Sequence, residues 1–282
     1  MKILITGGKG QLGTEVTYYL HKLGYEVYSY GREDLDFTNC EEVSRLIHEI
    51  RPDVIVHSGA YTQVDLAETE VDEAYQVNAY GTRNLVVAAE AVGAKFIYIS
   101  TDYVFAGEGQ VPYHEFMACQ PKTVYGLSKL AGEQLVQQLS SKFFILRTSW
   151  VYGAYGNNFV KTMLNLAKDR KELSVVHDQV GSPTYTYDLA QFIEKIMKTQ
   201  MYGIYHTSNT GFCSWYEFAQ AIFEEAGLDH IQVHPIETKD FPRPAPRPAN
   251  SRLDHMAIRL NGFRDFRHWR EALAEYLQNE VK

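Results

Sequence analysis

TGGKGQLG, residues 6–13, is the stretch that decides the fold class of this 282-residue chain. The apolar residues before it, 2–6, predict a β-strand, and apolar residues recur at helical spacing over 11–23 directly after it. Glycines between a first strand and a first helix are typical of the tight βα turn that begins a Rossmann-type fold.

The spacing of Gly7, Gly10 and Gly13 indicates a dinucleotide site at this turn. The spacing is one residue longer at its first step than the usual fingerprint, but the strand–turn–helix context is the one that the fingerprint requires. Glycine lets the backbone turn and approach a pyrophosphate, and the unpaired N–H groups at the helix start supply hydrogen-bond donors. We therefore expect these glycines to bind a dinucleotide cofactor.

The first half of the chain alternates short β-rich runs with helical stretches. Strands separated by helices of about ten or more residues indicate βαβ units and a parallel sheet covered on both faces. The predicted fold class is therefore α/β, a Rossmann-type doubly wound parallel sheet. The strands are predicted over 2–6, 26–30, 53–57, 95–100 and 143–148, and the helices over 11–23, 41–50, 69–92 and 124–141.

The second half is less regular and predicts a smaller C-terminal substrate-binding lobe. Residues 241–250, FPRPAPRPAN, carry four prolines and exclude a regular helix or a central strand. We expect a dinucleotide-binding domain over 1–150 and a mainly substrate-binding lobe over 151–282, part of which returns to the Rossmann sheet. Helices are expected over 158–169, 187–198, 215–226 and 267–278, and short strands over 173–176 and 202–206.

Composition narrows the class of partner. A formal net charge of −8 argues against a nucleic acid, because binding to phosphate backbones requires clustered Lys and Arg. No stretch approaches the roughly 18 apolar residues of a membrane span, and the N-terminal apolar run is too short for a secretory signal. Cys40, Cys119 and Cys213 have no metal-ligand spacing, so we expect reduced thiols in a cytoplasmic enzyme.

The residues after the second predicted strand favour NADPH over NADH. A carboxylate at this strand tip accepts a hydrogen bond from the ribose 2′-OH of NADH, whereas an arginine accommodates the 2′-phosphate of NADPH. The strand runs into Gly31-Arg32-Glu33-Asp34, so Arg32 is placed for a phosphate. Glu33 and Asp34 are near enough in sequence to reach the ribose, and the use of NADH therefore stays open.

A Tyr-x-x-x-Lys pair supplies the candidate acid. In a chain with 20 tyrosines and 14 lysines chance alone provides about one such pair, and this chain has two, Tyr125–Lys129 and Tyr18–Lys22. Tyr18 falls late in the first helix, away from the carboxyl ends of the strands. Tyr125 falls near the start of the helix that leads into the fifth strand, on the side where parallel sheets bind ligands.

The chemistry of this pair suits the reduction of a carbonyl group. Residues four apart share one helix face, so Lys129 is expected to lower the pKa of Tyr125 and to hydrogen-bond the nicotinamide ribose. A tyrosine tuned in this way gives a proton to a carbonyl oxygen as hydride arrives. Thr101, at the end of the fourth predicted strand, is expected to hydrogen-bond the same carbonyl.

Longer motifs carry a resemblance to one family. TGGKGQLG, STDYVF (100–105) and YGLSK (125–129) together resemble the extended short-chain dehydrogenases/reductases. Residues 57–68, 148–153, 178–184 and 247–254 resemble, in the expected order, the dTDP-4-dehydrorhamnose reductases within that superfamily. The resemblance spans nearly the whole chain. It implies NAD(P)H-dependent reduction of the C4 keto group of dTDP-4-dehydro-β-L-rhamnose to give dTDP-L-rhamnose.

The resemblance also implies roles for individual residues. Thr101, Tyr125 and Lys129 match the catalytic set, and Thr101, Asp102 and Trp150 match substrate contacts. Arginines in the proline-rich segment are candidates for the nucleotide diphosphate, Arg247 first among them; a solvated surface loop is the alternative. Cofactor-contacting positions are matched by Gly10, Gln11, Leu12, Asp36, Phe37, Ala60, Tyr61 and Thr62, with Asp36 and Phe37 expected at the adenine.

Metal use and assembly stay open at this point. Some members of the family pair through a metal that glutamates bind, and Glu15 and Glu271 fall near such positions. The place where a third carboxylate is expected, four residues after Pro183, holds Tyr187. We therefore assign no metal site, and we leave open both dependence on Mg²⁺ and the choice between monomer and homodimer.

Two other functions compete with that of a reductase. A nucleotide-sugar dehydratase or epimerase uses the same scaffold, but a dehydratase needs an Asp-Glu pair after the strand-four threonine, where this chain has Asp102-Tyr103. The non-catalytic regulatory subunit of methionine adenosyltransferase resembles these reductases and keeps similar motifs. Oxidation of NADPH in the presence of a dTDP-4-keto-6-deoxy sugar separates the reductase from this non-catalytic subunit.

Overall fold

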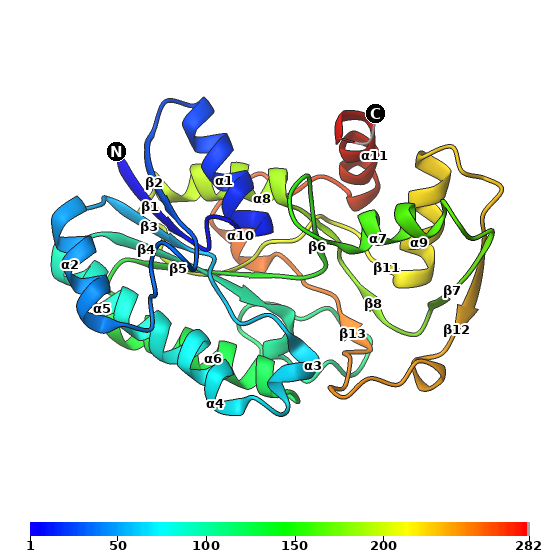
Figure 1. Ribbon diagram of the computed structural model, residues 1–282, viewed down its shortest axis with the longest axis horizontal. Helices are drawn as coiled ribbons and strands as arrows, with labels where there is room; N and C mark the ends of the chain where they lie inside the picture. The colour runs from blue at the N-terminus through cyan, green and yellow to red at the C-terminus, as the bar shows by residue number, and fades with distance from the viewer. Residues whose placement is uncertain (281–282) are drawn as a thin grey trace.

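The computed structural model describes residues 1–280 and has at its centre a sheet of six strands, every neighbouring pair of which is parallel (Figure 1). The order across the sheet is β10-β5-β4-β3-β1-β2. The prediction of a Rossmann-type α/β fold is confirmed. The strands are β1 (Lys2–Thr6), β2 (Glu26–Tyr30), β3 (Val54–His57), β4 (Lys95–Thr101), β5 (Phe143–Thr148) and β10 (Gly203–His206).

The order of the strands reverses at β1, because β2 pairs with one side of it and β3 with the other. In such sheets ligands bind outside the carboxyl ends of the strands at the point of reversal. The register ends β1 and β3 together, with Thr6 beside His57, whereas β4 and β5 run three residues further, because His57 lies beside Tyr98 and Thr101 beside Thr148. The sheet thus provides one edge on which a site can be built.

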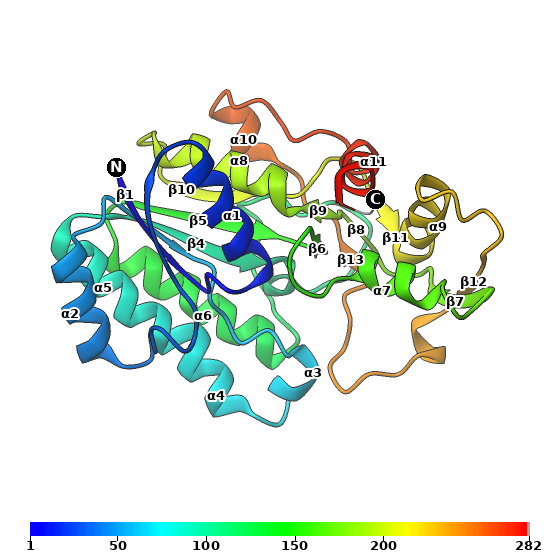
Figure 2. The ribbon, with the colours of Figure 1, turned by 45° about the horizontal axis from the view of Figure 1, so that its top comes forward.

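Helices cover both faces of the sheet (Figures 1 and 2). Because both faces are covered, the strands are apolar on both sides: Ile3 and Ile5 point into one layer and Leu4 into the other. One face carries α1 (Gln11–Lys22), α8 (Thr186–Met197) and α10 (Met256–Leu260), and the other carries α2 (Cys40–Ile50), α5 (Thr82–Val92) and α6 (Val124–Leu139).

The segment 69–92 is not the single α-helix that its periodicity predicts. After the short α3 (Val64–Ala67), the chain runs through α4 (Val71–Tyr75), a π-helical turn η1 (Gln76–Gly81) and then α5. The extent of the segment is close to the prediction, but the π-helical turn is missed, because apolar spacing does not reveal one wider turn. Turns of this kind are frequent at functional sites.

The lobe lies beside the carboxyl ends of the strands and has its own apolar core (Figure 1). Its helices are α7 (Phe159–Leu166), α9 (Trp215–Glu225) and α11 (Trp269–Glu280). The strand β12 is not predicted from the sequence, because Pro235 interrupts its pattern; proline is tolerated there since β12 pairs on one side only. The short strands are β6 (Val151–Tyr152), β7 (Glu172–Val176), β8 (Val180–Gly181), β9 (Thr184–Tyr185), β11 (Cys213–Ser214), β12 (Gln232–Ile236) and β13 (Asn250–Ser251).

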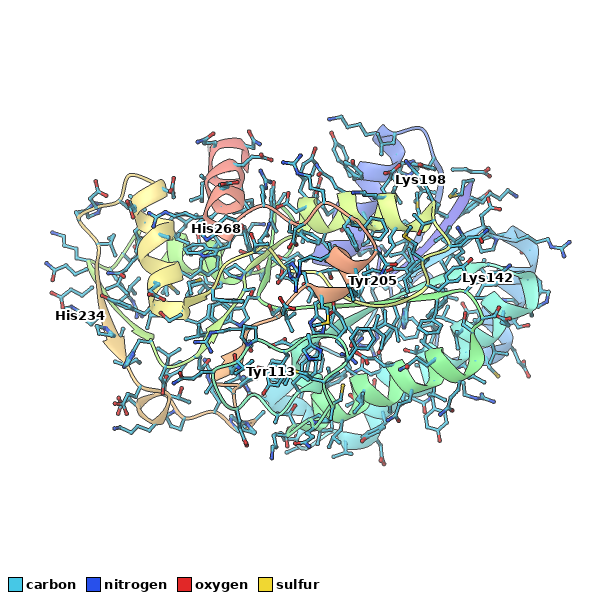
Figure 3. All side chains as sticks on the ribbon, turned by 180° about the vertical axis from the view of Figure 1, so that it is seen from behind. Tyr113, Lys142, Lys198, Tyr205, His234 and His268 are labelled. Atoms are coloured by element: carbon cyan, nitrogen blue, oxygen red, sulfur yellow. The ribbon has the colours of Figure 1, made fainter. Side chains whose placement is uncertain are left out.

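Three elements after residue 150 belong to the sheet and its layers, namely α8, β10 and α10. Seen from behind, Lys142 and Lys198 lie at the Rossmann end of the molecule and His234 and His268 in the lobe (Figure 3). The division into domains at residue 150 stays a prediction. Among the residues described, no helix is long and apolar enough to cross a membrane.

Candidate active site

A cavity of about 1820 Å³ lies between the carboxyl ends of the sheet strands and the lobe. Pockets for one small ligand are typically roughly 300–1,000 Å³, so this cavity has room for a dinucleotide and a second ligand together. Both halves of the chain line it, including Gly10 before α1, Thr101 at the end of β4 and Trp215 in α9.

The glycine turn forms one end of the cavity. Gly10 precedes α1 without a side-chain cap, so the N–H groups at the start of this helix are free for an anion. Gly7 has a φ of 69°, and a Cβ there would lie 2.6 Å from the nitrogen of Gly59. Gly7, Gly10, Gln11 and Leu12 line the cavity, and the turn therefore fits a pyrophosphate.

Gly13 differs from the other predicted cofactor residues, because it does not line the cavity. A Cβ on Gly13 would lie 2.1 Å from the carbonyl oxygen of Gly7. Its lack of a side chain lets α1 pack against the turn. The structure thus gives Gly13 a packing role in place of the predicted contact with the dinucleotide.

Cationic side chains gather where β2 ends. Arg32 has a side chain that is 92% exposed, and its ion pair with Glu73 spans 3.7 Å. Lys9 pairs with Asp34 at 3.0 Å, and both cations line the cavity. The Asp34 carboxylate also accepts from the Gly31 N–H at 2.9 Å, so it is engaged in the turn. Arg32 remains available for an anionic group.

The other predicted cofactor residues line the same end of the cavity. The Phe37 ring is wedged against Gly59 and Gly81, since a Cβ at either glycine would lie 2.7 or 2.5 Å from the ring. The Asp36 carboxylate accepts from the N–H and the hydroxyl of Thr38. Lining residues from this group are Asp36, Phe37, Ala60, Tyr61 and Thr62.

Asn78 holds the loop after β3 in place. Its Oδ1 accepts from the Tyr61 N–H at 2.8 Å, and its Nδ2 donates to the Tyr61 carbonyl at 3.1 Å and to Ser128 Oγ at 3.0 Å. This buried amide therefore joins the loop after β3 to α6. The π-helical turn brings Asn78 to this point, and no sequence pattern predicted that geometry.

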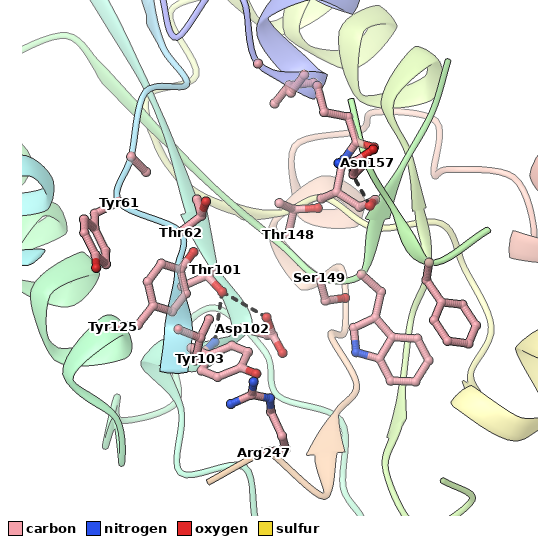
Figure 4. Close-up of a pocket in the computed structure, with 18 of the residues that line it drawn as sticks. Tyr61, Thr62, Thr101, Asp102, Tyr103, Tyr125, Thr148, Ser149, Asn157 and Arg247 are labelled. Atoms are coloured by element: carbon pink, nitrogen blue, oxygen red, sulfur yellow. Dashed lines mark hydrogen bonds between the residues drawn. The ribbon is translucent and has the colours of Figure 1, made fainter. Parts of the chain in front are cut away.

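Helix α6 presents Tyr125, Lys129 and Glu133 on one face at successive turns. Thr123 caps the helix, and its hydroxyl accepts a main-chain N–H of the first turn at 3.0 Å. Tyr125 and Lys129 line the cavity, as Figure 4 shows for Tyr125. Tyr18 is 60% exposed on α1 and does not line it.

The protonation of Tyr125 follows from its burial. Burial raises the pKa of Tyr125 to about 12, although the hydroxyl of Thr101 opposes the rise. Lys129 does not contribute to this shift. Its side chain donates to the Ile99 carbonyl at 2.7 Å. The expectation that Lys129 lowers the pKa of Tyr125 is therefore wrong for this arrangement. Tyr125 keeps its proton at neutral pH, which is the form that a proton donor requires.

Thr101 and Asp102 lie where β4 passes into the short turn η2 (Asp102–Val104). Thr101 Oγ1 accepts from the Tyr103 N–H at 3.2 Å and donates to Asp102 Oδ1 at 3.0 Å (Figure 4). Burial raises the pKa of Asp102 to about 6, and the hydroxyl of Ser251 opposes the rise. Within residues 1–280, Asp102 Oδ2 has no hydrogen-bond partner of ordinary geometry.

Trp150 forms the wall of the cavity on the side of the lobe. Its φ of 48° is left-handed, which is rare for a bulky residue and is found mainly at functional sites. The indole stacks on Trp215 with ring centroids 3.6 Å apart. Gly181 leaves room for it, since a Cβ there would lie 2.8 Å from the indole. The sequence does not predict a role for Trp215, because its partner is distant in the chain.

Arg247 lines the cavity but is already paired. Its guanidinium donates to Asp65 at 2.7 Å and to the Ala245 carbonyl at 2.9 Å, which ties the proline-rich segment to α3. Arg243 lines the cavity with its guanidinium 4.4 Å from the Phe241 ring centroid. The role of Arg247 at a diphosphate stays a prediction.

Residues 1–280 contain no group of three His, Cys, Asp or Glu side chains placed to bind a metal. Glu15 is buried and accepts a hydrogen bond from Thr186 at 3.0 Å. Tyr187 packs edge-on against Tyr19. We assign no metal to this region, and dependence on Mg²⁺ and the oligomeric state stay open.

The fold and the cavity together define a class: a Rossmann-type oxidoreductase with the tyrosine–lysine helix of the short-chain dehydrogenases/reductases. The chain belongs to the family described as RmlD substrate binding domain, whose model matches residues 1–281. The predicted resemblance to the dTDP-4-dehydrorhamnose reductases is confirmed.

Individual relatives are similar over almost their whole length. The chain is 47% identical to the spore coat polysaccharide biosynthesis protein SpsK of Bacillus subtilis (strain 168), over 98% of this chain and 97% of that one. It is 42% identical to dTDP-4-dehydrorhamnose reductase of Escherichia coli (strain K12), over 93% and 92%. A solved dTDP-4-dehydrorhamnose reductase from Bacillus anthracis str. Ames, in complex with NADP, has a TM-score of 0.96, 49% identity and 98% coverage of both chains.

Proposed function

We propose that this chain reduces the C4 keto group of dTDP-4-dehydro-β-L-rhamnose, with NADPH, to give dTDP-L-rhamnose. The observation that carries the proposal is the meeting of Thr101, Tyr125 and Lys129 at one cavity with the glycine turn. The relatives named dTDP-4-dehydrorhamnose reductase support this substrate, and the solved relative in complex with NADP supports the cofactor.

A bound dinucleotide supplies the hydride for C4. The residues of the chain bind the dinucleotide, orient the sugar and protonate its carbonyl oxygen. The uncapped start of α1 and the Gly7 turn would hold the pyrophosphate, and Lys129 would donate to the nicotinamide ribose. Tyr125 gives its phenolic proton to the carbonyl oxygen. Trp150 and Trp215 supply an apolar wall that excludes water from one side of the sugar.

Tyr103 distinguishes this chemistry from that of a dehydratase. It occupies the position after Asp102 where a dehydratase carries glutamate, and its ring packs edge-on against Tyr125 with centroids 5.4 Å apart. Burial raises the pKa of Tyr103, so it does not act as a base near neutral pH. The site therefore supports protonation at one oxygen and not elimination of water across two carbons.

The proposal is tested by the rate at which the purified protein oxidises NADPH with dTDP-4-dehydro-β-L-rhamnose. We expect turnover that depends on both compounds and yields dTDP-L-rhamnose, identified by chromatography against an authentic standard. Binding of NADPH without any turnover would instead support a regulatory subunit. Interconversion of sugars without net oxidation of NADPH would support an epimerase.

Cofactor preference is expected to depend on Arg32. We expect Arg32→Ala to raise KM for NADPH about tenfold and to leave KM for NADH within about twofold, because one charge-assisted hydrogen bond to the 2′-phosphate contributes about 1.5–3 kcal/mol. Steady-state rates with each dinucleotide measure this. Arg45→Ala, which removes an exposed arginine on α2 outside the cavity, is the control. An equal change in both KM values for Arg32→Ala contradicts the prediction.

The pH dependence is expected to reflect Lys129. Burial lowers the pKa of Lys129 to about 7, and the negative charge of Glu133 opposes this. A lysine is cationic below its pKa and neutral above it, so the positive charge beside the nicotinamide ribose, which attracts the anionic dinucleotide, is lost as the pH rises. We therefore expect kcat/KM for NADPH to fall through about pH 7. Initial rates at limiting NADPH measure the profile; Lys129→Met is expected to lack this step, and a wild-type profile without it contradicts the assignment.

A further inference from the structure

The Thr101 hydroxyl has no proton to spare in this arrangement. A threonine hydroxyl offers one O–H donor and two acceptor lone pairs. The O–H donates to Asp102 Oδ1 at 3.0 Å, and one lone pair accepts the Tyr103 N–H at 3.2 Å. The sequence predicts that Thr101 donates to a substrate carbonyl. While Asp102 is a carboxylate, Thr101 therefore cannot do so, and it cannot donate to a phenolate at Tyr125 either.

The surroundings of Asp102 favour the gain and loss of a proton by its carboxyl group. It is 6% exposed and lines the cavity, and its Oδ2 has no ordinary hydrogen-bond partner among the residues described. The groups that face it are Tyr103 beside it, Tyr125 on α6 and Ser251 on β13. Arg247 lies in the same part of the cavity (Figure 4), but it forms its ion pair with Asp65. A buried carboxylate without a cationic partner of its own readily takes up a proton.

Tyr125, Thr101 and Asp102 lie one after another in space across the site. Figure 4 shows the Thr101 side chain between Tyr125 and Asp102. The Thr101 hydroxyl is close enough to Tyr125 to lower the pKa of the phenol, and it is hydrogen-bonded to Asp102. Lys129 is the other group near Tyr125, but its ammonium donates to the Ile99 carbonyl. Thr101 therefore lies between Tyr125 and the one carboxyl group to which it is itself hydrogen-bonded, Asp102.

We propose that Asp102 returns a proton to Tyr125, through the Thr101 hydroxyl, after each reduction; this inference rests on the proposed function. When Tyr125 has protonated the carbonyl oxygen, it is left as a phenolate. The O–H bond of Thr101 breaks as a new O–H bond forms on Tyr125. The O–H bond of the Asp102 carboxylic acid breaks as that of Thr101 is restored. Asp102 becomes a carboxylate and takes up its next proton from the hydronium ions of the bulk solvent, and this is the one proton that the reduction consumes.

The experiment compares the first turnover with the steady state. Wild-type protein and Asp102→Asn are each mixed with NADPH and dTDP-4-dehydro-β-L-rhamnose, both compounds being in several-fold excess over the protein. The absorbance of NADPH is followed by stopped flow. An asparagine accepts the Thr101 hydrogen bond but delivers no proton. We expect the ratio of the first-turnover rate to the steady-state rate to rise at least tenfold in Asp102→Asn. In the wild type the ratio should rise with pH as Asp102 loses its proton, whereas in the variant it should stay high at every pH.

Companion variants keep the result interpretable. Thr101→Val breaks the route and should raise the ratio as well, whereas Thr101→Ser keeps a hydroxyl and should restore the wild-type ratio. Asp240→Asn, which changes another carboxylate at the cavity, should leave the ratio unchanged. Equal falls of both rates in Asp102→Asn, or in Thr101→Val if the first variant does not fold, would overturn the proposal. Absence of wild-type turnover would contradict the proposed function itself.

Discussion

Replacing Tyr125 with phenylalanine is expected to lower kcat for carbonyl reduction about a thousandfold, because a positioned general acid contributes typically 10²–10⁴-fold. The change removes one hydroxyl from a side chain that lines the cavity and leaves its ring in place. The affinity for NADPH should change little, since the pyrophosphate binds at the glycine turn. Steady-state kinetics measure kcat, and quenching of tryptophan fluorescence by NADPH measures the dissociation constant.

The chain contains its own control for this experiment. Tyr18 also precedes a lysine by four residues, but it is 60% exposed on α1 and lies outside the cavity. Tyr18→Phe is therefore expected to keep wild-type kcat. If Tyr125→Phe retains more than about a tenth of wild-type kcat, Tyr125 is not the acid, and another group must protonate the carbonyl oxygen.

The Rossmann half of the molecule was predictable because its signals are local. Strands such as β1 and β5 are continuous apolar runs, and the glycine turn follows the first of them. The order of motifs along the chain then places Thr101 and Tyr125 on the same edge of the sheet, since parallel strands end together. The prediction of a shared site required only this topology, and the structure brings both residues to one cavity.

The features that sequence analysis missed depend on contacts between distant segments. Trp150 and Trp215 stack across 65 positions, and no local pattern shows that pairing. Strands of two residues, such as β8, carry too little periodicity to be read. The direction of the Lys129 ammonium was missed for a different reason. Helical spacing places it on the same face as Tyr125, but the Ile99 carbonyl decides which way it points.

A buried ion pair lies one helical turn beyond Lys129. Glu133 is fully buried and accepts from Arg147 at 2.7 and 2.9 Å and from Ser100 at 2.5 Å. Arg147 extends from β5 and Glu133 from α6, so the pair joins this helix to the sheet. The negative charge of Glu133 also raises the pKa of Lys129 against the effect of burial.

We expect Arg147→Met to lower the free energy of unfolding by about 3–5 kcal/mol, because it leaves Glu133 buried without a charged partner. The midpoint of urea unfolding measures the change. The double variant Glu133→Leu/Arg147→Met removes both charges and should recover most of the loss. Arg270→Met breaks an exposed pair with Glu224 and should cost less than about 1 kcal/mol. A cost for Arg147→Met no greater than that of Arg270→Met contradicts the prediction.

The double variant also tests how this ion pair acts on the site. Without Glu133, nothing on α6 opposes the effect of burial on Lys129, so the pKa of Lys129 should fall further. Lysine carries its charge only below its pKa, and the loss of kcat/KM for NADPH should therefore begin at a lower pH than in the wild type. A double variant that is as stable as the wild type, yet shows this displaced profile, would separate the electrostatic effect of Glu133 on Lys129 from its contribution to folding.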